Sequence, residues 1–174
     1  MASERVHRAV VFAARAHAGQ DRKYTGEPYL VHPLRVLRLV ADAGGSDDVQ
    51  VAAVLHDVVE DCDVGLAEIR DGFGERVAEL VGWLSDVSRP EDGPRRARKA
   101  LDRDHLAAAP PEAQTVKLAD LIDNTESIVE RDPRFASVYM AEKRQLLDVL
   151  TKGGERLMRI ARARLAEWEA GGGA

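Results

Sequence analysis

The amino-acid sequence predicts an all-α protein, and two observations support this prediction. Alanine, leucine, arginine and glutamate dominate its 174 residues, and the alternating β-branched pattern that marks strands is scarce. Apolar residues instead recur at helical spacing between glycines and prolines, which mark where helices end or begin. Because no linker or internal repeat divides the chain, the pattern predicts roughly nine helices around one core, in a single domain over residues 1–174.

The first half of the chain is expected to form five helices. Ser3 has a side chain typical of an N-cap, and Gly19 ends the helix that follows. The pair Gly44-Gly45 separates the second helix from the third. The expected helices cover about residues 3–18, 34–43, 46–60, 66–71 and 75–84.

Residues 20–33 are expected to be irregular, because glycine and proline recur in this segment. The segment allows a short β-hairpin near residues 22–31. His32 is then expected in a bend just before the second helix.

The second half is expected to form four helices. Pro110-Pro111 suits the first turn of a helix, where the missing N–H of proline costs nothing. The expected helices cover about residues 95–108, 111–129, 135–151 and 154–170.

The composition excludes several classes of protein. The net charge of −5 and the aromatic content of 5% argue against nucleic acid as a partner. No apolar run approaches the ~20 residues that span a bilayer, and the N-terminus lacks the features of a signal peptide. A single cysteine, Cys62, excludes an internal disulfide and fits a reducing compartment, so we expect a cytoplasmic protein that does not bind membranes.

The residues that carry chemistry begin with His56 and Asp57, which are adjacent on the expected third helix. Glu60 follows His56 by one helical turn, and Asp61 follows Asp57 by one turn. A charged helix face with one partly buried histidine is the simpler interpretation. However, such groups set among aliphatic residues repel one another and are costly to desolvate unless a cation relieves them.

Two further residues complete a candidate metal site, His32 and Asp120. Asp120 ends the run Val116-Lys117-Leu118-Ala119, which is otherwise largely apolar. Two histidines and two aspartates offer the mixed nitrogen and oxygen ligands that suit Mn²⁺, Fe²⁺ or Zn²⁺ better than Ca²⁺. Such a set leaves positions for water and a phosphate oxygen.

The ordered set His32, His56-Asp57 and Asp120 resembles the HD phosphohydrolase superfamily. The match is closer to the hydrolase domain of RelA/SpoT-type alarmone enzymes and their small single-domain forms, which include the metazoan SpoT homologue. It covers about residues 5–150, and the helix expected over about residues 154–170 lies beyond it. The matching motifs lie in residues 16–23, 26–33, 55–61, 73–74 and 117–124.

This resemblance implies a compact all-α HD domain that binds one Mn²⁺. It implies removal of the 3′-pyrophosphate of guanosine 3′,5′-bis(diphosphate), which yields GDP (or GTP) and pyrophosphate. By position, the metal ligands are His32, His56, Asp57 and Asp120.

The resemblance also implies roles for residues around the metal ligands. Glu60 and Asp61 position or deprotonate the attacking water. Arg22 and Lys23 line the nucleotide pocket near the base, Asn124 contacts the ribose region, and Tyr139 matches a pocket tyrosine. The residues thus implied to contact substrate are Arg22, Lys23, Asn124 and Tyr139.

One departure from the family leaves the substrate open. The run after Asp120 places Asp123 beside Asn124, and an acid there disfavours a highly anionic substrate. The alternatives are another phosphoester, such as a nucleoside monophosphate or the 2′-phosphate of NADPH, or a catalytically silent nucleotide-binding module. Intact Glu60 and Asp61 argue against the silent module.

The basic helix over residues 95–103 allows two interpretations. Arg95, Arg96, Arg98, Lys99 and Arg103 form either a solvated surface or a border of the pocket that attracts polyphosphate. Likewise, Lys117 either meets a phosphate or forms a structural salt bridge. By contrast, His17 is interpreted as a packed core histidine.

Overall fold

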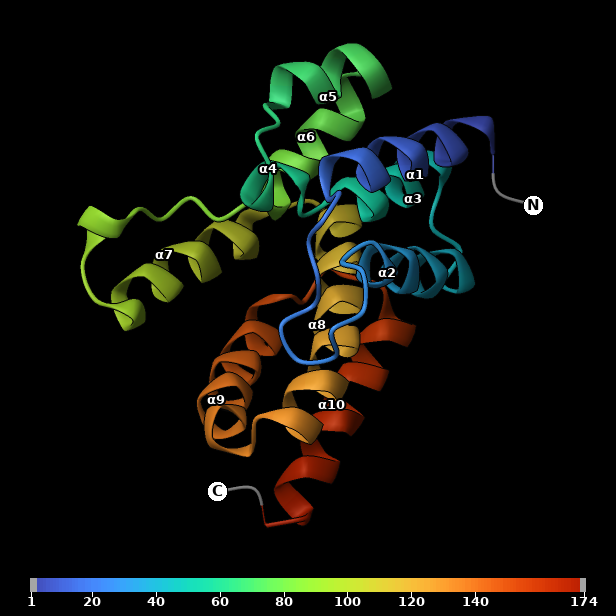
Figure 1. Ribbon diagram of the computed structural model, residues 1–174. Helices are drawn as coiled ribbons and strands as arrows, with labels where there is room; N and C mark the ends of the chain where they lie inside the picture. The colour runs from blue at the N-terminus through green and yellow to red at the C-terminus, as the bar shows by residue number, and fades with distance from the viewer. Residues whose placement is uncertain (1–2, 173–174) are drawn as a thin grey trace. The chain divides into compact units, whose positions relative to one another are not determined.

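The computed structural model describes residues 3–172 (Figure 1). Within these residues the chain forms ten α-helices, one short 3₁₀ turn and no strand, which confirms the all-α prediction. The chain forms two compact units, the first ending at Ser85 and the second beginning at Asp86. The single domain expected over residues 1–174 therefore stays a prediction. In the described residues no helix is long and apolar enough to span a membrane.

The first unit is arranged around its third helix. Residues 51–55 of this helix are all buried, and it packs against α1, α2 and α6. A helix that is apolar on all sides is stable only when other elements surround it, which explains its central place. The helices of this unit are α1 (Glu4–Ala16), α2 (Val31–Asp42), α3 (Asp47–Leu55), α4 (Val58–Asp61), α5 (Leu66–Phe73) and α6 (Glu75–Leu84).

The first helix begins where the sequence predicts. The Ser3 side chain accepts a hydrogen bond from the N–H of Val6 at 3.2 Å, so one unpaired donor of the first turn is satisfied. The helix ends at Ala16 rather than Ala18, because His17 leaves the helical conformation.

The prediction of one continuous helix over residues 46–60 is wrong. The helix stops at Leu55, and a second short helix starts at Val58, with His56 and Asp57 in the turn between them. The His56 side chain lies with Nδ1 at 2.9 Å from the carbonyl oxygen of Ala53. This side chain competes with the backbone for an acceptor that a continuous helix would use, which favours a break at this point.

The segment before α2 also differs from expectation. Its only β structure within the described residues is one antiparallel bridge between Asp21 and Pro28, rather than a hairpin near residues 22–31. His32 lies in the first turn of α2 and not in a bend before it. Pro33 follows it inside the helix, where a residue of the first turn needs no N–H donor.

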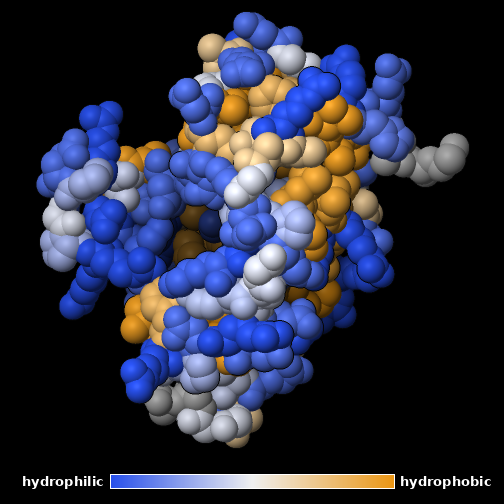
Figure 2. Space-filling view, in the orientation of Figure 1, coloured by the Kyte–Doolittle hydropathy of each residue, from blue (hydrophilic) through white to orange (hydrophobic). Residues whose placement is uncertain are grey.

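The second unit is arranged around its longest helix, α8, which packs against α9 and α10. Pro111 occupies the first turn of α8, as predicted, and Asp132 caps α9 by accepting the N–H of Phe135 at 3.1 Å. The hydrophilic surface of the basic helix α7 is visible in Figure 2. The helices of this unit are α7 (Arg95–Ala108), α8 (Pro111–Arg131), α9 (Pro133–Val149) and α10 (Glu155–Ala170), preceded by the 3₁₀ turn Pro90–Asp92.

A buried amide, Gln114, ties two loops of the second unit together. Its side chain is fully buried, and its Nε2 donates to the carbonyl oxygen of Leu106 at 3.0 Å. Its Oε1 accepts the N–H of Lys152 at 2.8 Å. One side chain thus satisfies backbone groups at the end of α7 and in the α9–α10 loop.

We expect Gln114→Ala to lower the free energy of unfolding by about 2–3 kcal/mol, because it leaves several buried backbone groups without partners. Urea denaturation followed by circular dichroism measures the change. The exposed Gln145→Ala is the control and should cost about 0.5 kcal/mol or less. Equal effects of the two substitutions would show that the buried amide has no special role.

Candidate metal centre and ligand pocket

Three side chains of the first unit converge in an arrangement that could hold a metal ion. His32 comes from the first turn of α2, and His56 and Asp57 come from the turn between α3 and α4. One ligand atom of each lies within 4.8 Å of the others. The Asp57 Oδ2 atom is 3.1 Å from His56 Nε2 and 3.4 Å from His32 Nε2. Both histidines are buried, whereas the Asp57 side chain is partly exposed.

The tautomer of His56 indicates that these residues fit a cation. Because the carbonyl oxygen of Ala53 can only accept, His56 Nδ1 carries the proton of their hydrogen bond. In the neutral ring Nε2 therefore has a lone pair, and it faces the Asp57 carboxylate. A divalent cation between them would accept both electron pairs and remove their repulsion. Histidines that bind metals commonly donate their other ring N–H to a backbone carbonyl, as His56 does. Two nitrogens and one oxygen suit a transition metal.

Tyr29 holds the carboxylate of this cluster. Its hydroxyl donates to Asp57 Oδ2 at 2.7 Å, and its ring stacks on His17 with the ring centroids 4.6 Å apart. Burial raises the pKa of the Tyr29 phenol, and the Asp57 charge raises it further, so the hydroxyl stays protonated as a donor. Sequence reasoning missed this role. The available signal was an amphipathic residue three positions before a candidate ligand.

His17, interpreted from the sequence as a core histidine, is indeed buried. Its Nδ1 lies 2.8 Å from Gln20 Oε1 and 3.3 Å from the Cys62 Sγ. Burial raises the pKa of the Cys62 thiol, and the Asp61 charge adds to this effect. A thiol with a raised pKa is a poor nucleophile.

Glu60 and Asp61 lie in α4 and are exposed. Despite the helix break, the N–H of Asp61 donates to the carbonyl oxygen of Asp57 at 2.9 Å. Asp61 therefore remains one turn after Asp57, as the sequence predicted from a continuous helix. Two solvated carboxylates thus follow a buried ligand cluster.

Arg22 and Lys23 belong to the loop before α2 and differ in exposure. Arg22 is buried in a tight turn, in which its N–H donates to the carbonyl oxygen of Glu27 at 2.8 Å. Lys23 is exposed, and its Nζ lies 4.9 Å from the ring centroid of Tyr24. The base contact expected of this pair stays a prediction.

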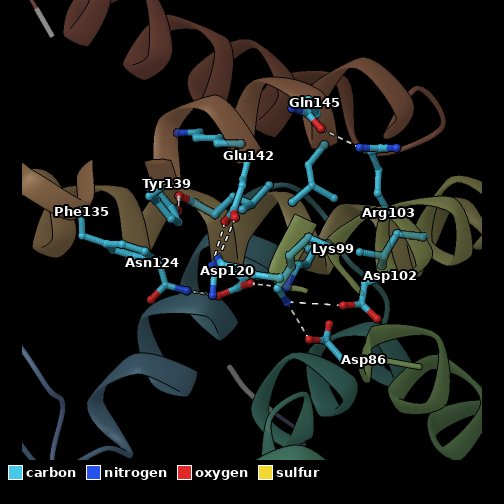
Figure 3. A pocket seen from close by; sticks show the side chains of 16 residues that line it. Asp86, Lys99, Asp102, Arg103, Asp120, Asn124, Phe135, Tyr139, Glu142 and Gln145 are labelled. Atoms are coloured by element: carbon cyan, nitrogen blue, oxygen red, sulfur yellow. Dashed lines mark hydrogen bonds and ion pairs between the residues drawn. The ribbon is translucent and has the colours of Figure 1, made fainter. Parts of the chain in front are cut away.

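Asp120 belongs to the second unit, where it is buried in α8. Its Oδ2 lies 2.8 Å from Lys117 Nζ, so the structural salt bridge is the interpretation of Lys117 that the structure supports. Asn124, one turn later, donates through Nδ2 to Asp120 Oδ1. Asp120, Asn124 and Tyr139 line one pocket of about 190 Å³ (Figure 3). Three of the predicted site residues therefore meet within this unit.

The basic helix α7 forms one wall of this pocket. Arg95, Lys99 and Arg103 line it, which favours the interpretation of a pocket border over that of a solvated surface. Each already has a partner within the second unit (Figure 3). Arg95 donates to Glu142 at 2.8 Å, Lys99 to Asp86 at 2.7 Å and Arg103 to Gln145 at 2.6 Å.

The opposite wall, formed by α9, combines aromatic rings with a buried cation. Phe135 and Tyr139 line the pocket, and the Tyr139 hydroxyl donates to the carbonyl oxygen of Leu121 at 3.2 Å. Lys143, one turn after Tyr139, is only 1% exposed, and its Nζ donates to Thr125 Oγ1 at 2.7 Å. Burial lowers the pKa of Lys143 to about 8, and the positive charge of Arg164 adds to this effect.

Sequence reasoning missed Lys143, although a signal was present. The buried positions of α9 follow helical spacing, and Lys143 occupies one of them between apolar residues. These buried positions are Ala136, Met140, Lys143 and Leu147. A lysine on an apolar stripe is rare enough to mark a candidate functional residue.

The fold and the His-His-Asp cluster define an all-helical protein with a site suited to a divalent cation. The HD domain family model matches residues 9–157, and the chain belongs to this family. A human relative, named guanosine-3′,5′-bis(diphosphate) 3′-pyrophosphohydrolase MESH1, is 39% identical over 138 residues, which cover 78% of this chain and 75% of the relative.

Longer bacterial relatives match over a smaller share of their length. The Aquifex aeolicus protein, also named guanosine-3′,5′-bis(diphosphate) 3′-pyrophosphohydrolase, is 36% identical over 126 residues, or 72% of this chain. The matched region spans only 18% of that relative.

Two solved structures resemble this chain. One, described as a metazoan orthologue of SpoT that hydrolyses ppGpp, superposes with a TM-score of 0.85 and 25% identity over 95% of this chain and 96% of its own. The other, from Listeria monocytogenes EGD-e, has a TM-score of 0.67 and 28% identity over 84% of this chain and 98% of its own.

We expect His56→Ala to weaken Mn²⁺ binding by more than the ~10–100-fold that loss of an outer hydrogen-bond partner costs, because it removes a ligand. Titration calorimetry of the metal-stripped protein measures the change. His7→Ala removes an exposed histidine of the same unit and should leave the affinity unchanged. Equal affinities of the wild type and His56→Ala would contradict the metal centre.

The same titration tests Asp120, whose assignment as a fourth ligand stays a prediction. Asp120→Asn keeps the shape of the side chain and removes its charge. Weaker Mn²⁺ binding would support the assignment, and unchanged binding would oppose it.

We expect Lys143→Met to be more stable than the wild type at pH 7 by about 2 kcal/mol, because burying the ammonium opposes folding. The pKa of Lys143 lies below its ordinary value, so the unfolded chain binds more protons between about pH 8 and 10.5. The free energy of unfolding of the wild type should therefore rise relative to that of the variant as the pH rises through this window. Urea denaturation at pH 7 and pH 10 checks this, and a constant difference would contradict a buried charged lysine.

Proposed function

We propose that this chain is a metal-dependent phosphohydrolase that removes the 3′-pyrophosphate of guanosine 3′,5′-bis(diphosphate). The products are GDP and pyrophosphate, or GTP where the substrate carries a 5′-triphosphate. One observation carries the proposal: His32, His56 and Asp57 form a compact cluster, followed one turn later by two carboxylates. The names of the human and bacterial relatives add the substrate to this chemistry.

We propose Mn²⁺ as the ion, with Fe²⁺ and Zn²⁺ as alternatives that the same ligand types accept. When bound, a divalent cation polarises a phosphoryl oxygen and makes a nearby water more acidic. The chain supplies the fixed ligands: the carbonyl of Ala53 orients His56, and the hydroxyl of Tyr29 orients Asp57. Asp120 is the proposed fourth ligand on the strength of the motif order.

Glu60 and Asp61 are the proposed proton acceptors. Water attacks the phosphorus bonded to the 3′ oxygen, and the bond between this phosphorus and the 3′ oxygen breaks. One carboxylate accepts a proton from the water, and the 3′ oxygen takes up a proton from solvent and leaves as the ribose hydroxyl. Both carboxylates lie in α4 and are exposed, so water can reach them.

Four residues are the proposed substrate contacts. Arg22 and Lys23 are proposed to face the base, since a guanidinium or ammonium binds aromatic faces and anions. Asn124 and Tyr139 are proposed to contact the ribose region, because both line the pocket beside Asp120. The proposed partner is thus a phosphorylated guanosine nucleotide.

One observation favours a second substrate class. Asp123 precedes Asn124 in α8 and is partly exposed, so it adds negative charge beside a proposed substrate contact. A less anionic phosphoester, such as a nucleoside monophosphate or the 2′-phosphate of NADPH, suffers less repulsion there.

We expect the purified chain to release pyrophosphate and GDP from guanosine 3′,5′-bis(diphosphate) with Mn²⁺, and to stop when a chelator is added. Replacing both Glu60 and Asp61 by Ala should lower turnover by at least ~100-fold, because general base catalysis is lost. Anion-exchange chromatography follows the products.

The matched control replaces Glu68 and Asp71 by Ala, which removes two exposed charges from α5 of the same unit. Its turnover should equal that of the wild type. A metal-loaded wild type without turnover would reject this substrate, and full turnover of the Glu60/Asp61 variant would reject the mechanism.

A further inference from the structure

The pocket of the second unit contains a buried ammonium group, that of Lys143, which has no acidic partner among the described residues. No ion pair of Lys143 is found in residues 3–172, and its polar partner is the neutral hydroxyl of Thr125 at 2.7 Å. Its charged neighbour is Arg164, which carries the same sign. Burial of such a charge is costly unless a counter-charge binds beside it.

The acidic residues of the pocket do not supply that counter-charge, because each lies against another cation. Glu142 accepts both hydrogen bonds from Arg95 at 2.8 Å, and Asp120 pairs with Lys117. Asp86 and Asp102 both face Lys99, at 2.7 and 3.5 Å. The five cationic and four acidic residues that line the pocket thus leave one positive charge over.

The hydrogen bonds around Thr125 leave Lys143 able to bind a further group. The Thr125 hydroxyl donates to the carbonyl oxygen of Leu121, so its lone pairs receive the proton of Lys143. An ammonium has three protons, and this bond uses one of them. The other two are available to an acceptor in the pocket that Lys143 lines.

We propose that Lys143 is a specificity-determining residue that binds a phosphate group of a nucleotide inside this pocket. Charge-assisted hydrogen bonds from an ammonium to phosphate oxygens are strong, above all where water is excluded. Phe135 and Tyr139 on the same helix offer aromatic faces to the sugar or base of the same ligand. The inference deepens the proposed function and rests on it for the nucleotide class, but it concerns binding and not hydrolysis.

A purely structural role for Lys143 makes a different prediction. If the lysine only holds Thr125 in place, its loss disturbs the pocket for charged and neutral ligands alike and lowers stability. If it binds phosphate, its loss weakens the binding of phosphorylated ligands alone, because the aromatic contacts to the sugar or base remain.

The test compares the wild-type chain with Lys143→Met, which keeps the length of the side chain and removes the charge. Titration calorimetry at pH 7 measures the Kd values of GDP, inorganic pyrophosphate and guanosine. We expect Lys143→Met to weaken GDP and pyrophosphate by about 10- to 100-fold and guanosine by less than about twofold. Arg159→Met removes one positive charge from an exposed position of α10 and should leave all three Kd values unchanged.

Three outcomes would overturn the proposal: unchanged GDP binding by Lys143→Met, an equal loss of guanosine binding, or a wild type that binds neither GDP nor pyrophosphate. Turnover of guanosine 3′,5′-bis(diphosphate) is measured separately on the same proteins. A wild type that binds GDP through Lys143 without hydrolysing this substrate would keep the phosphate site and reject the proposed reaction.

Discussion

The hydrogen bond from His56 Nδ1 to the carbonyl oxygen of Ala53 governs the arrangement of the metal centre. It fixes the tautomer of the ring, so the nitrogen with the lone pair faces Asp57. It also favours the end of α3 at Leu55, which places His56 and Asp57 in a turn instead of on divergent faces of a helix. The surrounding residues complete this constraint, since Tyr29 donates to the same carboxylate.

Buried polar groups in the second unit fall into two kinds. Gln114 and Asp102 are satisfied by the chain itself: Asp102 accepts the N–H groups of Val87 and Ser88, at 3.1 and 2.9 Å. Burial alone would raise the pKa of Asp102, but the hydrogen bonds from the N–H and the hydroxyl of Ser88, together with the charge of Lys99, outweigh it and lower the pKa. Lys143 is the other kind, because among the described residues its buried charge is bonded only to the neutral hydroxyl of Thr125. A buried charge of this kind is tolerated where a bound ligand supplies the opposite charge.

Much of the fold follows from the sequence because helix signals are local. Ser3, Gly19 and Pro111 each act within one turn, and the helices begin or end close to where these residues predict. The break at His56 was not predictable in this way. It depends on a side chain bonding to the backbone, whereas the apolar pattern of Val54 to Val59 continues through it.

The candidate site was predictable to a similar extent. Motif order selected His32, His56 and Asp57, and the structure brings these three together. The roles of Tyr29 and Lys143 depend on distances between segments far apart in the chain or on burial, which spacing alone does not give. The bend predicted at His32 was wrong because of Pro33. Proline ends a helix when it lies in the interior but is accepted in the first turn, where Pro33 lies.

The pocket that contains Asn124, Tyr139 and Lys143 is lined wholly by residues after Ser85, whereas His32, His56 and Asp57 all precede it. Mutations that reshape the pocket therefore fall in a stretch of the gene separate from the codons of these three ligands. Substitutions in the pocket can therefore change which molecules bind there while His32, His56 and Asp57 stay the same.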